Sequence, residues 1–234
     1  MRGLGTIVNV VAIVAGTLVG LAGGSRLPER MRTTVLQGLG LSVVALGVHD
    51  SLATHNLVFP IVSLVVGAVI GEALSIEERL ESVGERIRRR VARATAEGGH
   101  ESTFVEGFVS ASLLFCVGPL AILGSIADGL GRGSQELVVK SALDGFISVA
   151  FASTLGIGVA FSAVSVGVLQ GTVTALAGLL ERVLTDRMVA EMAATGGIVV
   201  MGIGARVLEL RKVRVGSFLP ALVIAPVAVA LFAR

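Results

Sequence analysis

The sequence predicts an all-α, polytopic membrane protein of seven or eight transmembrane helices with internal inverted repeats. The mean hydropathy is +0.89 and only 15% of the residues are charged. Several uncharged runs approach the length of about 20 apolar residues that crosses a bilayer. One acid-bearing apolar segment also occurs twice. We therefore expect residues 1–234 to form a single membrane domain.

Residues 1–75 hold the first three expected spans, at 4–24, 34–50 and 57–75. Each is dominated by Val, Leu, Ile, Ala and Gly, as hydrocarbon requires. Glycines at Gly16 and Gly20, and at Gly67 and Gly71, form small-xxx-small pairs. Such pairs let two helices approach closely. We expect packing seams there, within the subunit or across a homodimer.

Residues 76–102 form a polar interruption, expected to be a cytoplasmic amphipathic helix and loop. Apolar residues recur at helical spacing, and Glu85 with Arg89 adds an i,i+4 pair. One interpretation is a solvated helix that packs on its own bundle. The other is a helix held by anionic lipid. We favour the first, because acidic residues partly cancel the basic ones. The apolar stripe consists of Ile76, Leu80, Val83, Ile87 and Val91.

Residues 103–160 carry the duplicated central pair, with expected spans at 103–126 and 138–158. The segment 106–110 (Glu-Gly-Phe-Val-Ser) recurs at 144–148 as Asp-Gly-Phe-Ile-Ser. Glycine and proline end the first copy and two glycines end the second, so we expect broken helices that free backbone groups near mid-membrane. The expected breaks lie at Gly118, Pro119, Gly156 and Gly158.

Residues 161–234 hold the last three expected spans, at 161–180, 189–208 and 216–233. The segment 16–23 resembles 171–178. Spans 1, 2, 3 and 4 then pair with spans 6, 7, 8 and 5. Each pair is an odd number of crossings apart, which predicts inverted topology. Chance similarity between Gly- and Ala-rich helices is the alternative for any single pair.

Loop charges predict the orientation. With both termini outside the cytoplasm, the inner loops carry most of the Arg and Lys, which satisfies the positive-inside rule. The outer side would hold Arg2, Arg132, Lys140, Arg182, Arg187 and Arg234.

The two duplicated acids are the main candidates for a functional site. A carboxylate inside hydrocarbon is costly and marks function by default. Glu106 and Asp144 each have a serine one helical turn later. Oxygen-rich surroundings suit a coupling ion, Na⁺ or H⁺, and no other cofactor is expected. The alternative is that both acids cap helix N-termini at the interfaces. The expected ion- or substrate-binding set is Glu106, Ser110, Asp144, Ser148, Ser112, Thr154 and Asn9, with Ser153 nearby.

Other polar residues suit structural roles better. Asn9, Gln170 and Ser42 are typical of interhelical hydrogen bonding. The cluster of His49, Asp50 and His55 matches no zinc spacing, so we expect no metal site. No nucleotide loop, catalytic motif or nucleic-acid patch occurs. We therefore expect neither an enzyme nor a nucleic-acid partner.

Four strings carry a family resemblance: residues 5–9, 102–108, 151–158 and 214–221. Together they resemble the YqgA-like proteins (domain of unknown function 554) of the bacterial inner membrane. The resemblance covers nearly the whole chain. It implies a multi-pass inner-membrane protein of a family described only as candidate transporters, and it supplies no substrate or site residues.

These observations predict a small secondary transporter, cation-coupled, with a central site near Glu106 and Asp144. Its partners would be the lipid bilayer and a small-molecule or ion substrate. An ion channel with the same acids at a constriction is one alternative. A non-transporting scaffold or signalling protein is the other.

Overall fold

The computed structural model describes residues 2–24, 28–95, 101–210 and 213–232, and their regular secondary structure is helical. The described residues contain no strand. The helices are α1 (Leu4–Gly24), α2 (Glu29–Ser51), α3 (Val58–Ala73), α4 (Ile76–Thr95), α5 (Glu101–Val117), α6 (Pro119–Gly129), α7 (Gln135–Leu155), α8 (Gly158–Ala175), α9 (Ala177–Val183), α10 (Asp186–Val207), the 3₁₀ helix η1 (Val215–Phe218) and α11 (Ala221–Phe232).

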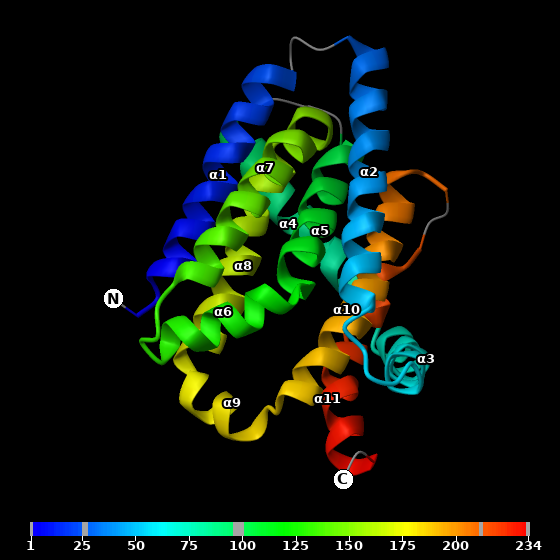
Figure 1. The fold of residues 1–234 in the computed structure, drawn as a ribbon. Helices are drawn as coiled ribbons and strands as arrows, with labels where there is room; N and C mark the ends of the chain where they lie inside the picture. The colour runs from blue at the N-terminus through cyan, green and yellow to red at the C-terminus, as the bar shows by residue number, and fades with distance from the viewer. Residues whose placement is uncertain (1, 25–27, 96–100, 211–212, 233–234) are drawn as a thin grey trace.

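Helices α1 and α7 lie side by side along most of their lengths (Figure 1). They run in the same direction, because Gly5 faces Leu137 while Gly20 faces Ala152 further along both helices. A Cβ at Gly16 would stand 2.3 Å from the carbonyl oxygen of Gly145. The first expected glycine seam is therefore a contact within the subunit that only glycine permits.

Helix α5 is the most enclosed helix of the bundle. Residues 107–115 are all buried, and Phe115 is fully inaccessible. Helix α5 runs parallel to α8, since Phe104 lies against Gly158 and Ser112 Oγ donates to Ser165 Oγ at 3.0 Å further along both helices. Of the two helices that carry the duplicated segment, α7 therefore packs against α1 and α5 packs against α8.

A second group of helices flanks this core. Helices α2 and α10 are antiparallel, because Gly40 meets Gly204 and Gly47 meets Gly197. Helix α3 contacts η1 and the start of α11 through Gly71 and Gly67, so the second expected glycine seam also lies within the subunit. Figure 1 views α3 nearly along its axis, which shows that it is steeply inclined to α1 and α2.

Five segments of the described chain are long and apolar enough to cross a membrane: α1, α7, α8, α10, and η1 with α11. Two bent pairs raise this to seven: α3 with α4, bent by 58°, and α5 with α6, bent by 61°. The expected count of seven or eight is met at its lower end. The expected span 34–50 forms α2, which is not among these segments. The expected span 161–180 is divided, because α8 ends at Ala175 and the short α9 follows.

The polar interruption forms helix α4, as predicted. Leu80 and Ile87 pack against the hydrophobic core, whereas Val83 is 43% exposed and leaves the predicted stripe incomplete. Glu85 accepts hydrogen bonds from Arg88 and Arg89. These bonds lower the pKa of Glu85 to about 2. Helix α4 therefore has the apolar contact expected of a helix packed on its own bundle. Val91 lies outside the described side chains.

Helices end at both expected positions, but only the first break divides an expected span, because α7 is one unbroken helix and Gly156 lies at its end. Helix α5 ends before Gly118, and Pro119 begins α6, a position that suits proline because its missing N–H is not needed there. Helix α7 ends before Gly156, which has a φ of +80° that favours glycine. The first break bends the chain sideways, whereas the second turns it back as α8.

Candidate functional site

Asp144 occupies the middle of α7 and faces α1 and α5. Its Oδ2 accepts a hydrogen bond of 2.9 Å from Asn9 Nδ2 and forms an ion pair with Lys140, one turn earlier on α7. Asp144 is 4% exposed, Lys140 5% and Asn9 fully buried. These three residues are called the α7 ion pair below. Because Asp144 lies well inside α7, it does not cap a helix N-terminus.

Helix α5 closes the other side of the ion pair. Lys140 Nζ lies 5.8 Å from the centroid of the Phe115 ring, a distance at which an aromatic face attracts a cation. The neighbouring Cys116 is a free thiol and partly buried. Two opposite charges removed from water by three helices attract each other strongly, and separating or removing one is costly.

Several polar atoms in the same interior have no hydrogen-bond partner among the described residues. They include Asn9 Oδ1, Ser110 Oγ, Ser148 Oγ, Thr6 Oγ1 and both side-chain atoms of Gln170. Asn9, Ser148 and Gln170 are fully buried. Buried polar groups are normally hydrogen-bonded, so this concentration calls for a functional explanation such as water or a polar ligand.

The other expected site residues have varied surroundings. Ser148 lies one turn beyond Asp144 and faces Gly16 across the α1–α7 seam. Ser112 is engaged with Ser165. Thr154 donates back to the carbonyls of Ala150 and Phe151, a local bond common for threonine in helices. Ser153 likewise donates to Ala150.

Glu106 lies in different surroundings from Asp144. It lines a cavity of about 940 Å³ between α4, the start of α5 and the end of α10. This cavity is called the inner cavity below, because the topology expected from the loop charges puts α4 on the inner side. Arg206 and Arg214 line the same cavity. The other lining acids are Glu77, Glu78, Glu81, Glu85 and Glu209. The sequence predicted equivalent sites for the two acids, and their environments differ because this end of α5 is covered by the charged helix α4.

Lys140 is the main residue that the sequence reasoning misplaced. It was counted among the charges of the outer loops, and it is buried inside α7. The signal was present, since a lysine four residues before an aspartate on a helix is an ion-pair spacing. The positive-inside rule counts every Arg and Lys near the end of a span as a loop charge. Lys140 was therefore not recognised as the partner of Asp144.

Besides Glu77 on α4, which pairs with Arg206, two further buried acids were missed. Glu191 on α10 is fully buried and accepts hydrogen bonds from Thr54 Oγ1 and from the backbone of His55 and Asn56. Asp128 at the end of α6 accepts the N–H of Gly5 at the start of α1, where negative charge is favourable. Both acids fix helix ends and loops in place.

Within the described residues, no group of three or more His, Cys, Asp or Glu is arranged to hold a metal ion. His49 Nδ1 and Asp50 Oδ1 are 3.1 Å apart, and the His49 side chain is 85% exposed. This pair is explained by its position at the end of α2.

Apolar helices that enclose a buried ion pair define the chain as a helical membrane protein with a polar interior. It belongs to the family described as "Protein of unknown function (DUF554)", whose profile matches residues 4–230. It is 30% identical over 230 residues to the "Uncharacterized membrane protein YdfK" of Bacillus subtilis (strain 168), covering 96% of this chain and 95% of that protein. It is 28% identical over 222 residues to the "Uncharacterized protein YqgA" of Escherichia coli (strain K12), covering 95% and 94%. No solved structure matches the chain.

Proposed function

We propose that this protein is a small secondary transporter of the bacterial inner membrane, with both termini outside and with Asp144 as its coupling acid. The observation that carries the proposal is the α7 ion pair, buried between α1, α5 and α7 beside unpartnered amides and hydroxyls. Ionisable groups at such positions in membrane proteins serve ion and proton pathways.

The ion pair favours H⁺ over Na⁺ as the coupling ion. Lys140 Nζ already occupies the cation position beside Asp144 Oδ2, and a second cation would be repelled by it. A proton neutralises the carboxylate without needing a coordination shell. Protonation of Asp144 then breaks the pair and leaves Lys140 charged for a solute or for a second conformation.

The helix contacts support alternating access between two inverted halves. Under the pairing predicted from the sequence, α1 corresponds to α8 and α5 to α7. The contact of α1 with α7 then corresponds to that of α8 with α5, and both pairs are parallel. The contact of α2 with α7 likewise corresponds to that of α10 with α5. Rocking of one half against the other would expose the ion pair to each side in turn.

Glu106 has a separate role in this proposal, at the cytoplasmic opening. The acids of the inner cavity outnumber its two arginines, so the cavity attracts cations, including protons released from Asp144. The sequence grouped Glu106 and Asp144 in one central site. The proposal keeps both on one pathway and makes Asp144 the coupling group.

The test uses purified protein in liposomes with an imposed pH gradient and an internal pH dye. Wild-type protein should move protons only when a co-transported solute is present, with saturable kinetics. Asp144→Asn should abolish the coupled proton movement, and Glu106→Gln should reduce it less. Flux that rises linearly with solute concentration would indicate the channel alternative. Proton movement that persists in Asp144→Asn would contradict the proposed coupling role.

A further inference from the structure

A cavity of about 490 Å³ opens at the end of the bundle opposite the inner cavity. It is lined by the start of α1, the end of α6, the end of α8 and the start of α9. The starts of α5 and α8 lie together, so the end of α8 is at the other end of the bundle. The walls are mostly small residues, among them Gly129, Gly171 and Gly178.

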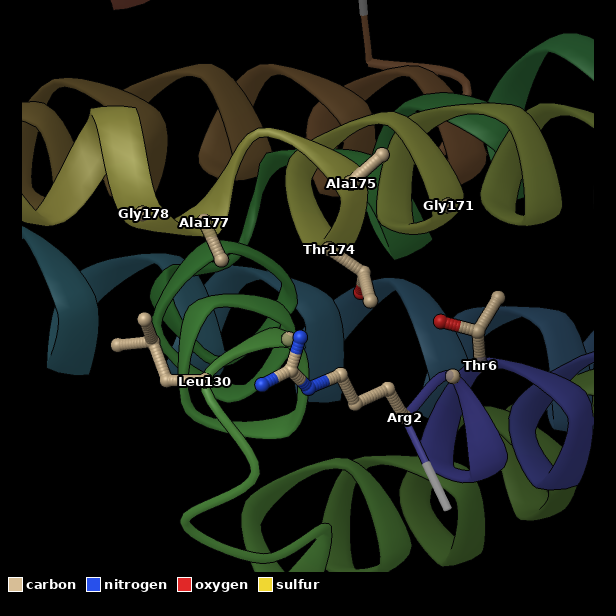
Figure 2. Close-up of a pocket in the computed structure, with 10 residues that line it drawn as sticks. Arg2, Thr6, Leu130, Gly171, Thr174, Ala175, Ala177 and Gly178 are labelled. Carbon is tan, nitrogen blue, oxygen red and sulfur yellow. The ribbon is translucent and has the colours of Figure 1, made fainter.

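The cavity has one charged side chain, Arg2. Figure 2 shows its side chain extending across the cavity towards Leu130. Among the described residues, no carboxylate lies within ion-pair distance of this guanidinium. A planar guanidinium that is free to pair is suited to two parallel hydrogen bonds with a carboxylate.

Thr6 supplies a second, independent indication of a ligand. Its side chain is 8% exposed and its hydroxyl has no partner among the described residues. Figure 2 shows that this hydroxyl points into the cavity, opposite Thr174. A buried hydroxyl without a partner is costly, and a polar ligand would satisfy it.

The cavity lies at the end of the bundle nearest to Lys140, because Gly5 at the start of α1 faces Leu137, one turn before Lys140 on α7. Asn9 follows Thr6 by one helical turn on the same buried face of α1, so it is about 4.5 Å deeper. Gln170, with both amide atoms unpartnered, immediately precedes Gly171 of the cavity wall. Unpartnered polar groups therefore continue from the cavity towards Lys140.

We propose that this cavity is the outer binding site for a small organic monocarboxylate, held by the Arg2 guanidinium and the Thr6 hydroxyl. The class follows from the chemistry, because one cation balances one negative charge and Leu130, Ala175 and Ala177 suit a short apolar body. The buried carboxyl of Asp128, next to Gly129, disfavours a dianion. The inference rests on the proposed function in one respect: the carboxylate would replace Asp144 as the partner of Lys140 once Asp144 is protonated.

The test measures binding of propionate to the purified full-length protein by ligand-observed NMR, with inorganic phosphate and propylammonium as comparison probes. Propionate should bind saturably and the other two should not. Arg2→Gln and Thr6→Val should each weaken propionate binding, the former by about tenfold. Thr6→Ser keeps the hydroxyl and should bind propionate as the wild type does. Arg132→Gln is the matched control, because Arg132 is an exposed guanidinium already paired with Glu181.

The outcomes separate this site from the coupling mechanism. Asp144→Asn should keep propionate binding while losing coupled proton movement. Propionate binding without any coupled transport would support the cavity and overturn the proposed coupling. Equal propionate binding by wild type and Arg2→Gln would overturn the cavity assignment, even if Asp144 proves to couple transport. Phosphate that competes as well as propionate would overturn the choice of a monocarboxylate.

Discussion

Helices α5 and α7 carry the same acid-glycine-phenylalanine pattern and use it differently. Asp144 is paired with Lys140 and Asn9 in the interior, whereas Glu106 lines a charged cavity under α4. In the sequence pairing, the counterpart of Lys140 is Ser102 and that of Asn9 is Val164. The duplicated acid is therefore retained in both copies while its polar partners occur in only one. Under the proposed function, the coupling site would thus be confined to one copy of the duplicated segment.

The largest expected effect comes from removing one member of the pair. Asp144→Asn leaves the Lys140 charge buried without its partner and should destabilise the protein by about 3–5 kcal/mol. Glu106→Gln should cost no more than about 1 kcal/mol, because Glu106 is only partly buried. The thermal unfolding of both variants can be followed with a thiol-reactive dye, which labels Cys116 when unfolding exposes it. The signal is specific because Cys116 is the only cysteine.

The double variant Lys140→Met/Asp144→Leu is the control for this comparison. It removes both charges together, so most of the lost stability should return while transport stays absent. Equal stability of the Asp144→Asn and Glu106→Gln proteins would contradict the asymmetry between the two helices.

The next effect concerns the close approach of α1 to α7. Gly16→Ala places a methyl group 2.3 Å from the carbonyl oxygen of Gly145, so the helices must separate, at a cost of about 1–3 kcal/mol. Gly23→Ala, on the same helix, has nothing within 4 Å and should be neutral or slightly stabilising. Midpoints of thermal unfolding in detergent compare the two, and similar midpoints would argue against this seam.

The equivalent glycines after the acids should also respond unequally. A Cβ at Gly107 would be 3.1 Å from Leu155 Cβ, whereas one at Gly145 would meet Ala12 at 3.4 Å or more. Gly107→Ala should therefore cost roughly 1 kcal/mol more than Gly145→Ala. Unfolding of both variants in denaturant gives this difference, and the opposite order would mean that α5 is packed less tightly than α7.

The smallest effect separates the two helix ends. Gly156 has a φ of +80°, so Gly156→Ala should cost about 1 kcal/mol. Gly118 has a φ of −69° and open space around its Cβ position, so Gly118→Ala should be nearly neutral. Thermal midpoints of the two variants are sufficient for this comparison. If Gly156→Ala leaves the thermal midpoint unchanged, residue 156 does not adopt the left-handed backbone conformation at the turn between α7 and α8.

Much of the fold was predictable from the apolar runs and from the glycine and proline residues that end helices. The positions of α1 and α7, the amphipathic α4, and the helix ends at Gly118 and Gly156 follow from hydropathy, helical spacing and glycine or proline. The inclination of α3 and the division of α8 from α9 depend on tertiary packing, which no local pattern reports. Seams at Gly16 and Gly67 were expected, but their partners could be identified only in three dimensions.

The candidate site was predictable in part. Asn9, Asp144 and Ser148 were expected in a polar interior and lie there. Lys140 was missed because a charge near the start of a span is indistinguishable, in a count of loop charges, from a solvated one. The different surroundings of Glu106 depend on where α4 folds back, and the duplication itself gave no indication of that. Arg2 and Thr6 meet the end of α8 only through the fold.

The parallel contact between α1 and α7 has a consequence for biogenesis. Helix α1 leaves the ribosome first, but the glycine and amide face that it presents at Gly16 and Asn9 is covered only after α7 has been made. Until then, the nascent chain must keep a polar side chain within the bilayer with no native partner. A polypeptide truncated before residue 135 therefore cannot complete its first helix contact, and membrane quality control should degrade it.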